Sequence, residues 1–133
     1  MLIVRGESGL AAEELLRRAI EKRIVLLDAG KVGSLEELEL AYVLAKKSLG
    51  DGSAISKKME IEFVLWLAGK KDIRRAFEEA GWKKGELIAV AFGMGKKELL
   101  AELELKERKL ETGNWKLGAG WEAVERISLS RIS

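Results

Sequence analysis

The residue types that most often carry out catalysis are missing from this chain, which contains neither histidine nor cysteine. Their absence excludes an imidazole general base, a thiolate nucleophile, a Ser-His-Asp triad and the usual zinc ligand sets. A small enzyme built on lysine, aspartate or glutamate chemistry is the competing class. The composition therefore favours a binding protein over an enzyme, and we expect neither a catalytic centre nor a bound metal or cofactor.

One short segment could still bind a phosphate group. Gly93–Lys97 lies between a predicted strand and a predicted helix, where phosphate-binding loops occur. A P-loop would need glycine at Val90 and serine or threonine at Lys97, and a dinucleotide fingerprint would need glycine or alanine at Glu98. A plain turn is therefore the favoured interpretation. The alternative is a small metabolite- or nucleotide-binding enzyme domain that uses Lys, Asp or Glu chemistry around Gly93–Lys96.

Two carboxylates stand apart from the others. Most acidic residues lie near basic ones at helical spacing, as Glu14 does with Arg17 and Arg18, and this pattern is typical of solvated ion pairs. Glu60 and Glu62 instead interrupt the most hydrophobic predicted helix of the chain. Residues two apart on a helix point about 200° apart, so these two cannot form one acid/base pair. A buried carboxylate must find hydrogen-bond partners, and we expect a structural role for Glu62.

The strongest local signal is a concentration of positive charge. Residues 57–84 contain eight basic and five acidic side chains, a net charge of +3 against +2 for the whole chain. Apolar residues stand among them, including Ile55, Ile73 and Trp82. Cations and apolar platforms together suit an unpaired nucleic-acid strand, whose phosphates need charge and whose bases need apolar contact. A solvated face of a lysine-rich protein is the alternative interpretation.

The elements that must position these residues form one α/β (α+β) domain over residues 1–133, with a small sheet of three or four strands packed against several helices. Short apolar runs predict strands at 1–5, 23–29 and 86–92. Apolar periodicity predicts helices at about 10–22, 35–49, 59–68 and 73–80. Residues 96–109 favour a helix, although a strand from Leu103 is also compatible, and a terminal helix or strand includes Trp121, Val124 and Ile127.

Local signals predict the helix ends and the buried faces. Ser34 with Glu37 forms a capping box, Ser56 and Asp72 are predicted N-caps, and Gly69 suits a left-handed C-cap. The residues 59–68 are far short of the ~20 needed to span a bilayer, so this segment is predicted to be a buried central helix and no membrane partner is expected. Spacing places further apolar residues inward, namely Leu16, Ile20, Leu35, Leu38, Tyr42, Ala45, Leu49, Ile73, Ala76 and Phe77.

The composition also indicates where the protein works. Without cysteine, and with a start that has neither a long apolar core nor a cleavage site, the chain is expected to be cytoplasmic. It has no glutamine and a single asparagine and threonine, while Lys, Arg and Glu are abundant, a bias reported for proteins of hyperthermophiles.

A set of short motifs in residues 55–81 resembles a known family. They are Ile55-Ser56-Lys57, then Glu62-Phe63, then Leu67-Ala68-Gly69-Lys70-Lys71-Asp72-Ile73. The arrangement is similar to the PRPK-binding-protein family, the small subunit of the KEOPS complex. Three positions depart from that family's pattern: Ala54 replaces asparagine, Trp66 replaces tyrosine, and Lys71-Asp72 replaces Arg-Gln.

The resemblance implies a non-catalytic protein with two binding surfaces. One would bind the single-stranded acceptor end of tRNA, in support of threonylcarbamoyladenosine formation, through Ile55, Ser56, Lys57, Lys70, Lys71, Ile73, Arg74 and Arg75. The other would bind the small KEOPS kinase/ATPase subunit. For it we nominate two apolar strips, one of Leu40, Val43 and Leu44 and one of Trp121, Val124 and Ile127.

Overall fold

The computed structural model describes residues 1–108 and residue 127. The chain divides into two compact units. The first, called the sheet unit here, comprises residues 1–31 and 81–110, and the second, the helical unit, comprises residues 32–80 and 111–133. Together the two units give the predicted mixture of helices and one small sheet.

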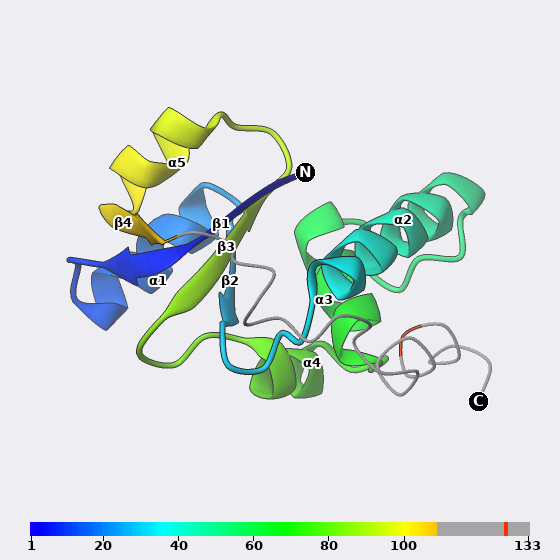
Figure 1. Cartoon of the computed structure of the whole chain (residues 1–133). Helices are drawn as coiled ribbons and strands as arrows, with labels where there is room; N and C mark the ends of the chain where they lie inside the picture. Colours follow the sequence, from blue (N-terminus) through cyan, green and yellow to red (C-terminus); the bar gives the residue numbers. More distant parts are fainter. Residues whose placement is uncertain (109–126, 128–133) are drawn as a thin grey trace. The chain divides into compact units, whose positions relative to one another are not determined.

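The sheet unit contains one antiparallel sheet of four strands in the order β2-β3-β1-β4 (Figure 1). Its strands are β1 (Leu2–Ser8), β2 (Val25–Asp28), β3 (Leu87–Ala91) and β4 (Leu105–Arg108). Helix α1 (Ala12–Glu21) connects β1 to β2, yet these strands do not pair, because β3 lies between them. The α+β class with a four-stranded sheet is confirmed.

The register of the sheet aligns one set of apolar residues on a shared face. Val4 of β1 and Leu26 of β2 both pair with Ala89 of β3, so alternate residues of three strands share that face. Leu15 of α1 and Leu99 of α5 (Lys96–Glu102) belong to the same buried cluster. Both helices therefore pack on this face, and all five residues of β3 are buried, as expected of a continuous apolar strand.

Helix α1 buries a narrower stripe than its sequence predicts. Leu15 and Ala19, one turn apart, are buried. The prediction that Leu16 and Ile20 point inward is wrong, since they are 40% and 77% exposed. They lie about 100° farther round the helix than Leu15 and Ala19, and so fall outside the buried stripe.

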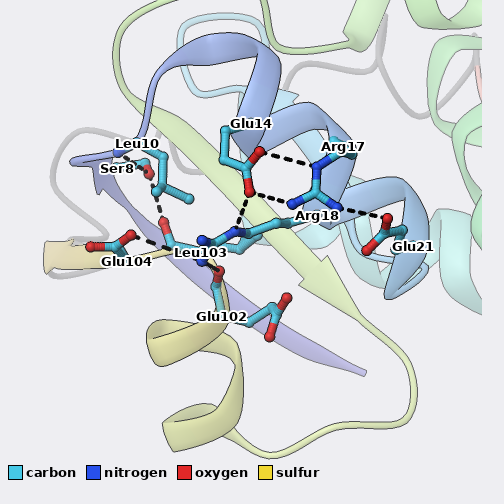
Figure 2. Close-up of polar contacts among 9 residues, drawn as sticks. All are labelled: Ser8, Leu10, Glu14, Arg17, Arg18, Glu21, Glu102, Leu103 and Glu104. Atoms are coloured by element: carbon cyan, nitrogen blue, oxygen red, sulfur yellow. Dashed lines mark hydrogen bonds and ion pairs between the residues drawn. The ribbon is translucent and has the colours of Figure 1, made fainter.

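The polar face of α1 carries the predicted ion pairs (Figure 2). Arg17 pairs with Glu14 and Glu21, and Arg18 pairs with Glu14. The Arg18 guanidinium also donates to the Glu102 carbonyl at 3.0 Å. Hydrogen bonds from Arg17 and then Arg18 lower the pKa of Glu14 to about 2. This network ties the surface of α1 to the end of α5.

Residues 96–108 form both a helix and a strand, the two alternatives that the sequence left open for this segment. Helix α5 ends at Glu102, Glu104 has a left-handed φ of 44°, and β4 follows. Ser8 Oγ donates to the Leu103 carbonyl at 2.6 Å, and Gly9 N donates to the Glu104 carbonyl at 3.1 Å. Hydrogen bonding to the β1 edge therefore ends the helix before Lys109, where local periodicity would have continued it.

Residues 32–80 of the helical unit form three helices, of which α2 packs against α3 and α3 against α4 (Figure 1). They are α2 (Leu35–Asp51), α3 (Met59–Ala68) and α4 (Ile73–Ala80). Seven consecutive residues of α3, from Glu62 to Ala68, are buried, which confirms the predicted central helix. None of the helices within the described residues is long and apolar enough to cross a membrane.

The helix ends follow the local signals with one exception. Ser34 Oγ accepts from Glu37 N at 3.3 Å, Asp72 Oδ1 accepts from Arg75 N at 3.2 Å, and Gly69 is left-handed with φ 66°. The prediction that Ser56 caps α3 is wrong, because the N-cap is Lys58. Ser56 Oγ instead accepts from Lys58 N at 3.2 Å within the preceding loop.

The buried faces of α2 and α4 are built from smaller residues than predicted. In α2 the buried residues include Leu38, Ala41, Ala45 and Ser48, whereas Leu35 is 37% exposed and Tyr42 and Leu49 are half-buried. In α4 the buried residues are Ala76 and Ala80, so the prediction of inward Ile73 and Phe77 is wrong. Small side chains allow close helix approach, which leaves larger neighbours at the rim.

Candidate nucleic-acid interface

The loop between α2 and α3, residues 52–58, is held in one conformation by hydrogen bonds. Asp51 Oδ1 accepts from both Ser53 N at 2.9 Å and Ser53 Oγ at 2.6 Å. Ala54 N donates to the Ser48 carbonyl at 3.1 Å. The side chain of Ile55 is 44% exposed and Lys57 is exposed. The loop thus presents an apolar and a cationic side chain from an ordered backbone.

Glu62 lies beneath this loop and is fully buried. Its Oε1 accepts from Ile55 N at 3.1 Å and from Ser56 N at 3.2 Å, and its Oε2 accepts from Ser48 Oγ at 2.5 Å. Trp66 Nε1 donates to the same Ser48 Oγ at 3.1 Å. These partners satisfy a buried carboxylate, as its burial requires, and they link the loop to both α2 and α3.

The structure separates the two glutamates that the sequence singled out. Glu62 has the buried partners described above, whereas Glu60 is half-buried on another side of α3. The two carboxylates do not form a pair, as the helical spacing predicts. Within residues 1–108 and 127, no group of three or more acidic side chains is placed to hold a metal ion.

A second basic group follows the end of α3. Lys70 is half-buried, and its backbone N donates to the Leu65 carbonyl at 3.0 Å, which fixes it to the last turn. Lys71, Arg74 and Arg75 are exposed. Ile73, one of the residues predicted to contact RNA, is 44% exposed beside them. The group therefore repeats the pairing of cations with an apolar side chain seen in the loop.

One of these cations, Arg74, has an ion pair at the surface. Arg74 Nε is 3.3 Å from Glu78 Oε1, but both side chains are largely exposed, at 89% and 59%. Such a surface pair contributes little stability and exchanges readily for another anion. The loop and the second basic group lie before and after α3, whose ten residues rise about 15 Å. The two groups therefore lie near opposite ends of this helix.

The nominated kinase-binding residues lie in different environments. In α2, Val43 is 59% exposed, and Leu40 and Leu44 are half-buried. Ile127 is fully buried. Trp121 and Val124 lie outside the described residues. The α2 strip of Leu40, Val43 and Leu44 is therefore the accessible part of this nomination in the described chain.

The Gly93–Lys96 segment has the geometry of a turn into α5. Lys96 Nζ lies 2.6 Å from Glu107 Oε2, so this lysine pairs with β4. A Cβ added at Gly93 or at Gly95 would meet no atom within 4 Å. Crowding by the described residues therefore does not demand glycine at either position, and the pairing of Lys96 supports the plain-turn interpretation over a nucleotide site.

The sequence pattern identified the loop and the second basic group, but it did not identify Ser48 as a partner of Glu62 or Trp66 as a partner of Ser48. The only local signal was a carboxylate within an apolar helix, which shows that a partner is needed without showing which residue supplies it. Phe77, 38% exposed one turn after Ile73, was also missed as a surface residue because its spacing predicts burial.

These features define a small α+β protein with an ordered, cationic and apolar surface in its helical unit. No protein-family model matches the chain. Its sequence is 33% identical over 115 residues to the KEOPS complex subunit Cgi121 of Pyrococcus abyssi (strain GE5 / Orsay), which covers 80% of this chain and 67% of that protein. The chain belongs to the Cgi121 family, the PRPK-binding family that its motifs predict.

Proposed function

We propose that this chain is a non-catalytic subunit of a KEOPS complex in the cytoplasm. In this role it binds the small kinase/ATPase subunit and the single-stranded acceptor end of tRNA, and so supports threonylcarbamoyladenosine modification. The observation that carries the proposal is the 33% identity to a protein named as a KEOPS subunit. The lack of histidine and cysteine supports a binding role in place of a catalytic one.

The surface of the helical unit supports RNA as one ligand. Exposed Lys57, Lys71 and Arg75 can neutralise phosphates, while Ile55 and Ile73 offer apolar contact to unstacked bases. Ser56, Lys70 and Arg74 complete the proposed contact residues. Lys71 retains the charge of the arginine that it replaces, but a lysine lacks the planar fork of a guanidinium. We therefore expect recognition based on charge and apolar contact.

The RNA half of the proposal is tested by the salt dependence of binding. Neutralising ~3 phosphates of a single strand predicts that log K falls with log salt at a slope of about −2. Charge reversal by Lys71→Glu or Arg75→Glu should weaken binding of a tRNA acceptor-end oligonucleotide and make this slope shallower. Lys97→Glu, an exposed change of the same charge in the sheet unit, is the matched control. Salt-independent binding, or equal effects of all three variants, would refute this surface.

The kinase half is tested on the exposed strip of α2. Val43→Glu should abolish capture of the KEOPS kinase subunit, because it places a charge in an apolar contact while the unbound chain keeps it in water. Ile20→Glu, at the 77% exposed position of α1, is the control for an added surface charge. A folded Val43→Glu protein that still binds the kinase would reject the strip, and variants at Trp121 and Val124 would then test the other nominated residues.

A further inference from the structure

We propose that the buried Glu62 is the positioning residue of the RNA contact, and that it acts by fixing the backbone of the Ile55–Lys57 loop. The inference rests on the proposed function, because it explains how that surface is held in shape. It assigns a task to a titratable side chain that is fully buried and therefore cannot itself touch RNA. A carboxylate in the apolar α3 would otherwise only add a desolvation cost.

Five backbone N–H groups of the loop donate to acceptors within the helical unit. The backbone N–H groups of Ile55 and Ser56 both donate to one oxygen of Glu62, at 3.1 and 3.2 Å. The N–H of Ser53 donates to Asp51 Oδ1, and the N–H of Ala54 donates to the Ser48 carbonyl. The N–H of Lys58 donates to Ser56 Oγ. These N–H groups are thus used within the helical unit and are not available to bind a phosphate.

This arrangement determines which atoms of the loop face the ligand. A loop that bound phosphate through its backbone would direct consecutive N–H groups outward, as anion-binding nests do. Here two consecutive N–H groups point inward to Glu62, and the exposed groups include the Ile55 and Lys57 side chains. Contact with RNA is therefore made through side chains. Its strength depends on the loop being ordered before binding, which lowers the entropy cost of association.

The second carboxylate oxygen of Glu62 explains why the loop and α2 are fixed together. Ser48 Oγ donates to it at 2.5 Å while accepting from Trp66 Nε1 at 3.1 Å. Ser48 Oγ also lies 3.1 Å from the Ala45 carbonyl, which gives the hydroxyl proton a second acceptor. In a Glu62→Gln protein the amide carbonyl can still accept from Ile55 and Ser56. The amide NH2 can then donate to Ser48 Oγ, whose own proton turns to Ala45.

The test compares two substitutions of similar size. Glu62→Gln keeps an acceptor for the loop, whereas Glu62→Met fills the space but leaves the N–H groups of Ile55 and Ser56 without their acceptor. We expect hydrogen exchange of these two amides to rise about tenfold or more in Glu62→Met and to stay within about twofold in Glu62→Gln. The dissociation constant for a single-stranded RNA with the tRNA acceptor sequence should rise at least about fivefold in Glu62→Met alone.

A control variant separates positioning from general loss of stability. Leu38→Ala removes a fully buried side chain of α2 without touching the network, so it lowers the melting temperature while leaving the loop anchored. Measured where every variant is folded, its RNA affinity should match that of the wild type. If Glu62→Met does not fold, Ser48→Ala removes one donor to Glu62 and should show the same changes to a smaller extent.

The outcomes distinguish this inference from the proposed function. A wild-type chain that binds no acceptor-end RNA overturns the proposed function. A Glu62→Met protein that binds RNA as tightly as the wild type, although its loop amides exchange freely, overturns the positioning role alone. Unchanged protection of the Ile55 and Ser56 amides in Glu62→Met overturns the anchoring itself. Coupled losses in Glu62→Met, rescued by Glu62→Gln, support the inference.

Discussion

Gly6 is a position where the sheet has no room for an added side-chain atom. It lies in β1 opposite Glu107 of β4. A Cβ built at this position would lie 2.3 Å from the Lys106 carbonyl oxygen and 3.0 Å from its carbonyl carbon. Both atoms belong to the backbone, so no side-chain rotation can remove the overlap. Gly6→Ala therefore forces β4 away from β1.

The expected loss of stability follows from two opposing effects. Overpacking a buried position costs about 1–3 kcal/mol, and a rigid backbone neighbour places Gly6→Ala near the upper end of that range. Replacing glycine in a strand also returns about 0.5–1 kcal/mol by restricting the unfolded chain. We expect a net decrease of about 2 kcal/mol in the free energy of unfolding.

Urea unfolding monitored by tryptophan fluorescence measures this change, with the shift in midpoint converted through the slope. Gly9→Ala is the matched control, because a Cβ added at Gly9 would meet no atom within 4 Å. Amide exchange in β4 should increase in Gly6→Ala, since Gly6 belongs to one of the four residue pairs that join β4 to β1 within residues 1–108. Equal midpoints for Gly6→Ala and Gly9→Ala would show that the two strands do not approach as closely as described.

Three further predictions concern stability and ligand binding. Leu99→Ala, which empties a fully buried position of α5, should cost about 3 kcal/mol in urea unfolding, and a loss under 1 kcal/mol would contradict its place in the core. Because the pKa of Glu14 is lowered from 4.5 to about 2, its stabilising contribution is complete above pH 4.5 and disappears as the pH falls toward 2. Glu14→Gln should therefore flatten that part of a pH–stability curve measured by thermal unfolding, and parallel curves for the two proteins would disprove the role of its arginine pairs. In a thermal-shift panel of nucleotides and metabolites, we expect that no compound stabilises the wild type through Lys96. A compound that raises the melting temperature of the wild type but not of Lys96→Ala would support the enzyme alternative at Gly93–Lys96.

The local sequence predicted most helices and strands and several of their ends. The hydroxyl of Ser34, the carboxylate of Asp72 and the left-handed Gly69 all act through neighbours within four residues. Such signals need no knowledge of the remaining chain. The motif at residues 55–57 and the excess of basic residues after α3 likewise identified the candidate surface and the family from the sequence alone.

The sequence could not predict which apolar side chains each helix buries. Ile20, Ile73 and Phe77 have the spacing of a buried face, yet all are exposed. Spacing shows which residues share a face, but the burial of that face depends on where the neighbouring element lies. Small residues such as Ala19 and Ala76 are buried instead, while the larger side chains beside them are exposed.

The sequence by itself therefore identified the kinds of helix and strand, several helix caps, the lack of histidine and cysteine, and the family. Only the tertiary structure decided that β3 lies between β1 and β2, that β4 ends α5 early, and that Ser48 supports Glu62 beneath the loop. The physical reason is the range of the interactions. Caps and periodicity act within one or two turns, whereas strand pairing and buried hydrogen bonds join residues that only folding brings together.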